Sequence, residues 1–221
     1  STGGGPPTPE ISPSFTVSAA PNSITFVFGR LEAASFVSVR LPEDDALVVS
    51  AGGQLKQMRW TVDPLGGGQY AASLTQIDGG TEVNISLTRS DGEGAPSSHV
   101  TMPTGLEVSA PVAGTSVTAG QDLLIAWAPS GLPDEMQVVM RTVSCTRVGA
   151  GNTVVTTLVW DPGTVTLAVD PSLLPPLASG EQCEVDVQVQ RLSNGVIDPA
   201  FAGGSFQARQ LDLVRIVVLQ P

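Results

Sequence analysis

The chain has 221 residues, and its 21 acidic and 10 basic side chains give a formal net charge of −11 at pH 7. This balance argues against nucleic acid and anionic membrane surfaces as partners, because both require a basic patch. The 24 glycines and 18 prolines interrupt the chain too often for long helices, which predicts an all-β fold.

The first nine residues contain no hydrophobic side chain, and we expect residues 1–12 to form a flexible tether. A tether of this composition resembles the start of mature bacterial lipoproteins, just after their lipidated cysteine. The resemblance implies a lipid anchor upstream of Ser1, and a plain secreted N-terminus is the alternative. No apolar run in the sequence reaches the roughly 18 residues of a membrane-spanning helix, so no transmembrane segment is predicted.

Residues 13–104 are expected to form the first β-sandwich domain. Short alternating or apolar segments recur at the spacing of sandwich strands and are separated by turns rich in glycine, proline and acidic residues. The expected strands are residues 15–17, 24–28, 36–41, 47–49, 58–62, 70–74, 83–87 and 99–102. Trp60 lies in one of them and is predicted to be the core aromatic residue of this domain.

Residues 105–221 are expected to form a second β-sandwich domain. Its opening, residues 111–127, resembles fibronectin type III and related immunoglobulin-like domains, in which a proline and a glycine lead into a strand, a turn and a strand ending in tryptophan. The resemblance implies an immunoglobulin-like sandwich with Trp127 as a core tryptophan. With the first domain, we expect two tandem immunoglobulin-like, Greek-key sandwiches. The further strands expected are residues 137–145, 153–160, 164–169, 183–191 and 205–219, the last with a bend.

The only two cysteines, Cys145 and Cys183, lie in two of these strands. They are either two buried free thiols or one disulfide. Strict alternation over residues 183–190 places Cys183 on the same face as three valines, and the parity of residues 139–145 turns Cys145 inward as well. We therefore predict a disulfide, which indicates an oxidising compartment such as a periplasm, a cell surface or the exterior.

The sequence offers few residues that could form a catalytic or metal-binding site. His99 is the only histidine, so a serine triad would depend on it alone, and no phosphate-binding loop or nucleophile elbow is present. We predict a protein that is not an enzyme and needs no cofactor. Glu43, Asp44 and Asp45 form the strongest acidic loop cluster and are weak candidates for calcium, the alternative being a solvated turn.

The C-terminal half resembles a family of uncharacterised exported lipoproteins of Gram-negative bacteria. The matching features are the Trp-x-Pro-Ser-Gly run at 127–131, the paired cysteines, and residues 195–205 leading into 208–210. Within that stretch, Phe201 is either a binding tip or tucked over the edge of the core.

The resemblance implies an exported protein of the periplasm or cell surface. We expect a non-enzymatic binding module with a protein or glycan partner. The alternatives are a passive spacer and a calcium- or carbohydrate-dependent adhesion module.

Overall fold

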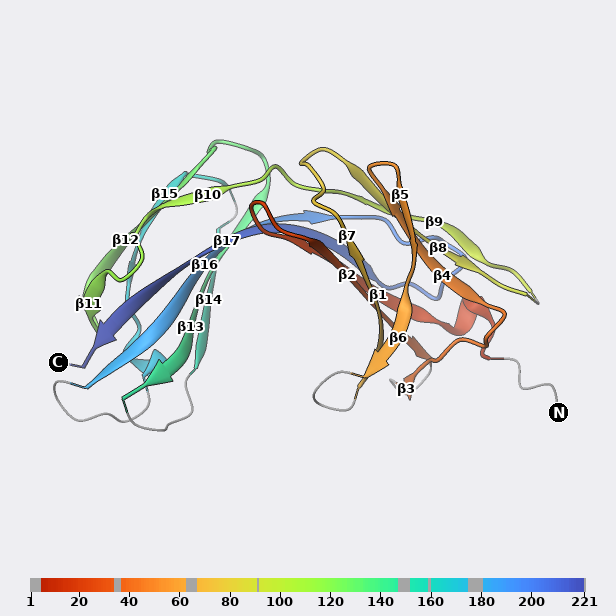
Figure 1. Ribbon diagram of the computed structural model, residues 1–221, viewed down its shortest axis with the longest axis horizontal. Helices are drawn as coiled ribbons and strands as arrows, with labels where there is room; N and C mark the ends of the chain where they lie inside the picture. The colour runs from red at the N-terminus through yellow and green to blue at the C-terminus, as the bar shows by residue number, and fades with distance from the viewer. Residues whose placement is uncertain are drawn as a thin grey trace. The chain divides into compact units, whose positions relative to one another are not determined.

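The computed structural model describes residues 5–33, 37–62, 67–90, 92–146, 152–158, 160–174 and 181–220. Within these ranges the regular structure consists of β-strands and two short 3₁₀ turns, with no α-helix (Figure 1). The strands form two β-sandwiches, which confirms the predicted all-β fold class. Phe36, which falls in an expected strand, lies outside the described residues.

Two compact units make up the chain, and each unit consists of two separate segments of the sequence. One unit contains Ser1–Thr104 and Ser193–Gln210, and the other contains Gly105–Leu192 and Leu211–Pro221. The sequence predicted a contiguous second domain over 105–221, and the structure differs in giving 193–210 to the first unit. The cause is the parallel pairing of Ser205–Gln210 with strand β1, a contact between segments about 190 residues apart that no local pattern encodes.

The first unit is a sandwich of two sheets. One sheet runs in the order β1 (Ser12–Ala19), β2 (Thr25–Ala33), β7 (Gly68–Leu74) and β6 (Arg59–Val62), with β3 (Val37–Ser38) paired to β2. The beginning of β17 (Ser205–Leu219) adds to this sheet in parallel beside β1. The facing sheet runs β5 (Gln54–Gln57), β4 (Ala46–Ala51), β8 (Glu82–Thr88) and β9 (Ala95–Thr101).

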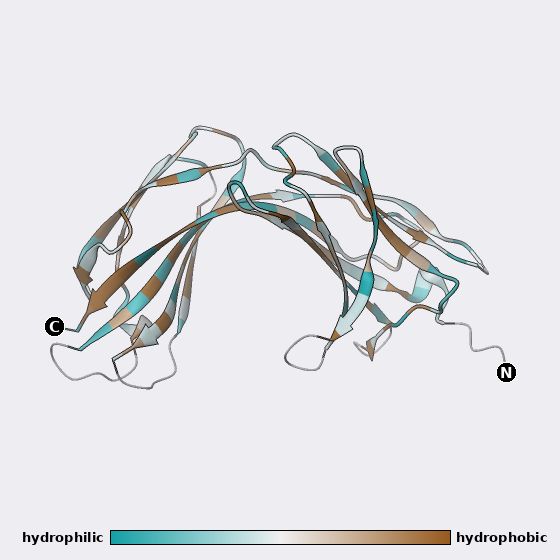
Figure 2. Ribbon diagram, in the orientation of Figure 1, coloured by the Kyte–Doolittle hydropathy of each residue, from teal (hydrophilic) through white to brown (hydrophobic). Residues whose placement is uncertain are grey.

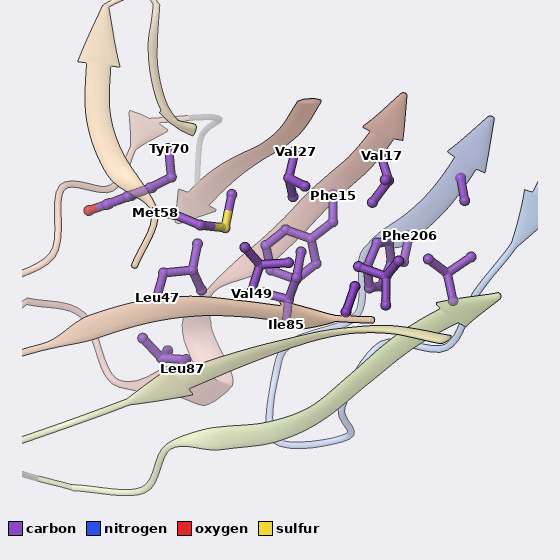
Figure 3. Close-up of a cluster of buried hydrophobic side chains, with 14 of the residues drawn as sticks. Phe15, Val17, Val27, Leu47, Val49, Met58, Tyr70, Ile85, Leu87 and Phe206 are labelled. Carbon is purple, nitrogen blue, oxygen red and sulfur yellow. The ribbon is translucent and has the colours of Figure 1, made fainter. Parts of the chain in front are cut away.

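The core of the first unit follows from the period-two alternation of its strands. In β1 the side chains at 13, 15, 17 and 19 are buried, whereas those at 12, 14, 16 and 18 face outward. Phe15 is 1% exposed and makes edge-to-face contacts with Phe206 and Phe201, at centroid distances of 5.4 and 6.3 Å. Figure 3 shows these inward side chains meeting Leu47 and other aliphatic residues from the facing sheet. Apolar interdigitation of this kind holds the two layers together.

A buried carboxylate helps to attach residues 193–204 to the first unit, beside the main-chain bridge between Val196 and His99. Asp198 accepts hydrogen bonds from the Ser97 amide at 2.7 Å, the Ser97 hydroxyl at 2.6 Å and the Ala200 amide at 2.8 Å. The Asp198 amide in turn donates to the Ser98 hydroxyl at 3.0 Å. Phe201 follows and is only 6% exposed, so it is tucked into the core and is not a binding tip.

Replacing Asp198 with asparagine is expected to destabilise the first unit by about 1 to 3 kcal/mol at neutral pH, because buried donors lose an ionised acceptor. Burial raises the pKa of Asp198, but the hydrogen bonds from Ser97 and Ala200 outweigh it and hold the pKa below its usual value. The stabilisation is therefore present above the unfolded-state pKa of about 3.9 and is lost as the pH falls through the folded-state pKa. Urea unfolding from pH 7 to pH 2 should show the two proteins converging in acid.

The control for this series is Asp44→Asn, which changes an exposed carboxylate in the same unit. It should leave the unfolding free energy within about 0.5 kcal/mol of the parent at every pH. If the difference in unfolding free energy between the parent and Asp198→Asn stayed constant down to pH 2, it would contradict the proposed role of the charged carboxylate.

The predicted N-terminal tether needs correction over residues 6–12. Thr8–Glu10 form a 3₁₀ turn, the Thr8 hydroxyl donates to the Glu93 carbonyl, and Arg89 donates to the Pro6 carbonyl at 2.8 Å. Ile11 is fully buried in the core. This isolated aliphatic residue anchors a segment whose composition otherwise resembles a linker.

The second unit is a sandwich with the strand order of an immunoglobulin-type Greek key. Its smaller sheet runs β10 (Glu107–Ala110), β12 (Asp122–Ala128) and β15 (Thr164–Ala168). The facing sheet runs β14 (Thr153–Leu158), β13 (Glu135–Cys145), β16 (Gln182–Asn194) and the end of β17, with β11 (Ser116–Thr118) parallel to β17. A second turn, η2 (Pro171–Leu173), follows β15. Figure 2 shows hydrophobic and hydrophilic segments alternating along the strands.

Candidate functional site

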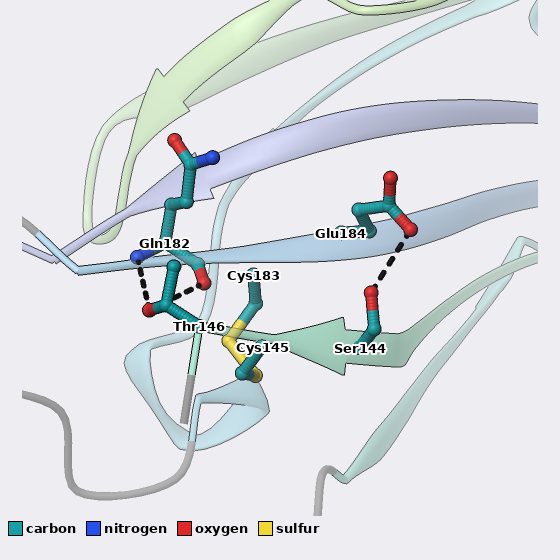
Figure 4. Close-up of a disulfide and its surroundings, with 6 residues drawn as sticks. All are labelled: Ser144, Cys145, Thr146, Gln182, Cys183 and Glu184. Atoms are coloured by element: carbon teal, nitrogen blue, oxygen red, sulfur yellow. Dashed lines mark hydrogen bonds between the residues drawn. A yellow bond between two sulfur atoms is a disulfide. The ribbon is translucent and has the colours of Figure 1, made fainter. Parts of the chain in front are cut away.

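A disulfide joins Cys145 and Cys183, as the sequence predicted, and it pins the ends of β13 and β16 (Figure 4). The two Cα atoms are 4.0 Å apart, and Cys183 is 1% exposed. Hydrogen bonds flank the bridge on both sides, one from the Ser144 hydroxyl to Glu184 at 2.9 Å. The bridge is therefore a structural staple of the second unit.

The acidic cluster proposed for calcium is split by the fold. Glu43 and Asp44 are exposed, but Asp45 is buried and forms an ion pair with Arg89, with Nε to Oδ2 at 3.0 Å. Asp45 also accepts hydrogen bonds from the amide and hydroxyl of Ser90. No group of three or more histidine, cysteine or acidic side chains is placed to hold a metal ion in the described ranges. Asp45 thus serves to anchor a loop.

The single histidine does not stand in a catalytic arrangement with its neighbours. The Ser97 hydroxyl donates to Asp198, while the His99 ring nitrogen Nδ1 lies 3.0 Å from the Ser97 carbonyl oxygen. A serine triad needs the histidine to bond the serine hydroxyl and the acid to bond the histidine. The geometry here instead serves to attach residues 193–204.

The two tryptophans that the sequence predicted as core residues occupy different environments, and only Trp127 is buried in a core. Trp60 is half-buried at the margin of the first core and packs edge-to-face on Tyr70 at a centroid distance of 5.2 Å. Trp127 is 3% exposed in the second core, and its indole nitrogen donates to Asp161 at 2.7 Å. Asp161 also pairs with the fully buried Arg191 at 2.6 Å. Burial raises the pKa of nearby Asp134, an effect that Arg191 opposes.

A face suited to ligand binding lies on the outer side of the β1-β2-β7-β6 sheet, and strand register defines it as two rows of side chains. The upper row places Phe26 between Ser18 and Ser73, and the lower row places Phe28 between Thr16 and Ala71. Neighbouring strands are about 4.8 Å apart, so the small flanking side chains leave Phe26 exposed and Phe28 partly exposed. We call this surface the outer aromatic face.

The two phenylalanine rings form a nearly parallel pair. Their centroids are 6.4 Å apart with an interplanar angle of 11°, and Phe26 is 45% exposed. They line a groove of about 590 Å³ together with Lys56, Gln57 and Arg59. Burying such rings is favourable by roughly 25 cal/mol per Å² of apolar area removed from water, so an exposed pair is a surface that gains from a ligand.

Two unpaired cations stand at the side of this groove. Lys56, the only lysine of the chain, and Arg59 are both exposed, and no acidic group of the described residues lies within ion-pair distance of either. Arg59 is in register with Ala71, which is itself in register with Phe28. In a chain of net charge −11, this local pair of positive charges marks a point where an anion is attracted.

A second hollow of about 360 Å³ adjoins the groove and shares Gln57 and Arg59 with it. Trp60 and Tyr70 contribute to its wall, and the Tyr70 hydroxyl accepts a hydrogen bond from the Leu41 amide at 2.6 Å. Burial raises the pKa of Tyr70, with smaller effects from Leu41, Arg40 and Asp45. The hydroxyl is committed to the fold, so the groups that this hollow offers a ligand are aromatic faces, an amide, guanidinium groups and the exposed carboxylate of Glu43.

Sequence reasoning placed Phe26 and Phe28 in a strand but gave them no role. The available signal was that residues 24, 26 and 28 are all bulky and apolar although Val27 already supplies the inward face. A strand that is apolar on both faces is either buried on both sides or carries an exposed hydrophobic surface. Phe26 belongs to the second case.

Comparisons with known proteins do not assign the chain to a family. No family model matches the sequence, and no curated protein matches it. The chain is similar to the Ig1–Ig3 ectodomain of mouse nectin-like molecule 4, with 13% identity and a TM-score of 0.31, over 97% of this chain and 66% of that one.

Two bacterial structures are similarly distant. The fibronectin(III)-like modules of Clostridium thermocellum CbhA show 15% identity and a TM-score of 0.28, over 95% of this chain and 93% of that chain. The Yersinia pseudotuberculosis adhesin InvE shows 11% identity and a TM-score of 0.26, over 94% and 60%. Scores this low carry no functional argument, and the fold assignment rests on the strand pairings above.

Proposed function

We propose that this chain is a non-enzymatic binding module of a bacterial cell envelope, exported to the periplasm or cell surface. The observation that carries the binding role is the outer aromatic face with its groove and unpaired cations. The disulfide supports an oxidising compartment. In the described part of the chain, no helix is both long enough and apolar enough to span a bilayer.

The composition of the face favours recognition over a purely structural role. A spacer gains nothing from exposing Phe26 and Phe28, because exposed aromatic area lowers solubility. Serine and threonine side chains surround the rings and can donate or accept hydrogen bonds, as in sites that orient a polar ligand. The face therefore combines an apolar contact area with polar groups able to give specificity.

The test is retention of the purified protein on isolated envelopes of a Gram-negative bacterium, compared with the variant Phe26→Ala/Phe28→Ala. We expect the double substitution to reduce retention at least tenfold, since two aromatic contacts are lost, each worth about 1 kcal/mol or more. Both side chains lie on the outer side of the sheet, so the variant should keep its thermal midpoint within a few degrees.

The matched control is Leu124→Ala, which removes another exposed apolar side chain, from strand β12 of the second unit. It should be retained like the parent. If all three proteins were retained equally, or if none were retained, the result would contradict the proposed binding role. The passive spacer would then remain as the alternative function.

A further inference from the structure

We propose that the outer aromatic face binds an acidic oligosaccharide, meaning a chain of sugar rings that carry carboxylate or sulfate groups. This inference rests on the proposed binding function and assigns its ligand class. It uses three features of the face that are independent of one another: the parallel rings, the neutral hydroxyl and amide side chains around them, and the two unpaired cations.

The aromatic pair fits the apolar side of a sugar ring. A pyranose directs its C–H bonds to one face, and these weakly positive hydrogens meet the negative face of an aromatic ring. Phe26 and Phe28 form a stacked pair along one strand, with centroids 6.4 Å apart, and a ring face that is turned away from the other ring is available to a sugar. Their flanks, Ser18, Ser73 and Thr16, are too small to block an approaching ring.

The polar side chains around the rings fit the sugar hydroxyls. The lower row continues from Thr16 to Gln207 on β17, and Gln57 lines the groove on the opposite side. Hydroxyl and amide groups both donate and accept hydrogen bonds, as sugar hydroxyls do, and they need no counter-charge. An apolar helix or an apolar protein patch would instead leave these groups desolvated without partners, which is costly.

The strand arrangement disfavours an extended peptide on this face. Peptides that add to sheets use the free main-chain groups of an edge strand. Strands β1 and β2 lie inside the sheet, with β17 and β2 on the two sides of β1, and β1 and β7 on the two sides of β2. Their main-chain groups are occupied by the ladders, so recognition over Phe26 and Phe28 has to proceed through side chains.

The cations select an acidic sugar over a neutral one. Lys56 and Arg59 line the groove beside the rings without acidic partners among the described residues. Guanidinium and ammonium groups bond carboxylate and sulfate with charge-assisted hydrogen bonds, which are stronger than neutral ones. The overall charge of −11 opposes non-specific adsorption of a polyanion, so such binding requires a local positive site such as this one.

The experiment measures affinity by calorimetry for four probes at low salt: hexagalacturonate, its neutral methyl ester, sulfated maltohexaose, and hexaglutamate. We expect hexagalacturonate or sulfated maltohexaose to bind at least tenfold more tightly than the neutral ester. The comparison between those two tells which anion is preferred. Hexaglutamate should bind at least tenfold more weakly, because it has the charge but no sugar ring.

Two variants and their controls locate the effect. Lys56→Gln/Arg59→Gln should abolish the preference for the acidic sugar over its ester, and Phe26→Ala/Phe28→Ala should weaken binding of both sugars at least tenfold. The controls are Leu124→Ala and Arg141→Gln, the second of which replaces an exposed strand arginine of the second unit. Neither control should change the affinity for the sugars, or the preference for the acidic sugar over its ester, by more than about twofold.

Equal affinity for the acidic sugar and its ester would overturn the assignment, as would equal affinity for hexaglutamate, or no binding of any sugar at millimolar concentration. If the sugars fail to bind but envelope retention still depends on Phe26 and Phe28, the binding function stands and only the ligand class is wrong. If retention is also independent of these residues, the binding function itself fails.

Discussion

Asp161→Ala is expected to destabilise the second unit by about 3 to 5 kcal/mol, the usual cost of removing one partner from a buried ion pair. Arg191 has a fully buried guanidinium whose Nη2 lies 2.6 Å from Asp161. The same carboxylate accepts hydrogen bonds from the Trp127 indole at 2.7 Å and from the Gly163 amide at 3.1 Å. The substitution therefore leaves the Trp127 and Gly163 donors without their acceptor, and it removes the closest carboxylate from the buried Arg191, which keeps Asp134 at 3.5 Å. Chemical denaturation followed by tryptophan fluorescence would measure the loss.

The matched control is Asp122→Ala, which removes an exposed carboxylate from β12 of the same unit and should cost less than about 0.5 kcal/mol. A second variant, Asp161→Leu/Arg191→Met, separates the buried charge from the other contacts. Replacing both members of a buried pair with apolar groups is often neutral, so this variant should regain part of the lost stability. If Asp161→Ala and Asp122→Ala cost the same, the network has no stabilising role.

Removing the disulfide is the second change with a large expected effect. Cys145 and Cys183 are 38 positions apart, and closing a loop of that length restricts the unfolded chain by an amount worth about 4 kcal/mol. We expect Cys145→Ala/Cys183→Ala to lose about that much stability. Hydrogen exchange should show the loss in amides of the second unit, because the bridge joins β13 to β16 there.

Reduction of the parent protein provides the internal control, since it opens the same loop without changing a side chain. It should reproduce the loss seen in the alanine variant. A loss below about 1 kcal/mol in both would show that the reduced chain keeps the loop closed by other contacts, which would contradict the staple role.

Local patterns in the sequence predict much of this fold because they report directly on strand faces. The alternation of Cys183 with valines places its side chain inward, and the structure pairs Cys183 directly opposite Cys145. Non-local pairing is the part that local patterns do not contain. Thus residues 193–210 read as part of the second domain, although Ser205–Gln210 lie beside β1.

The residues of the candidate site are also brought together by non-local pairing, which local sequence patterns do not contain. The bulky residues Phe26 and Phe28 are visible in the sequence, but their small flanks Ser18, Ser73, Thr16 and Ala71 come from two other strands. Lys56 and Arg59 reach the groove because the chain passes from one sheet to the other at Met58, between β5 and β6. The contacts among Trp127, Asp161 and Arg191 likewise span 30 residues or more.

The measurement that tests the central claim most directly is an amide chemical-shift titration of the isotope-labelled protein with hexagalacturonate. If the outer aromatic face is the binding site, the largest chemical-shift changes will fall on β2, β7 and the segment from Lys56 to Arg59. These changes will disappear in Phe26→Ala/Phe28→Ala. Shifts concentrated in the second unit, or unchanged by that substitution, would contradict it.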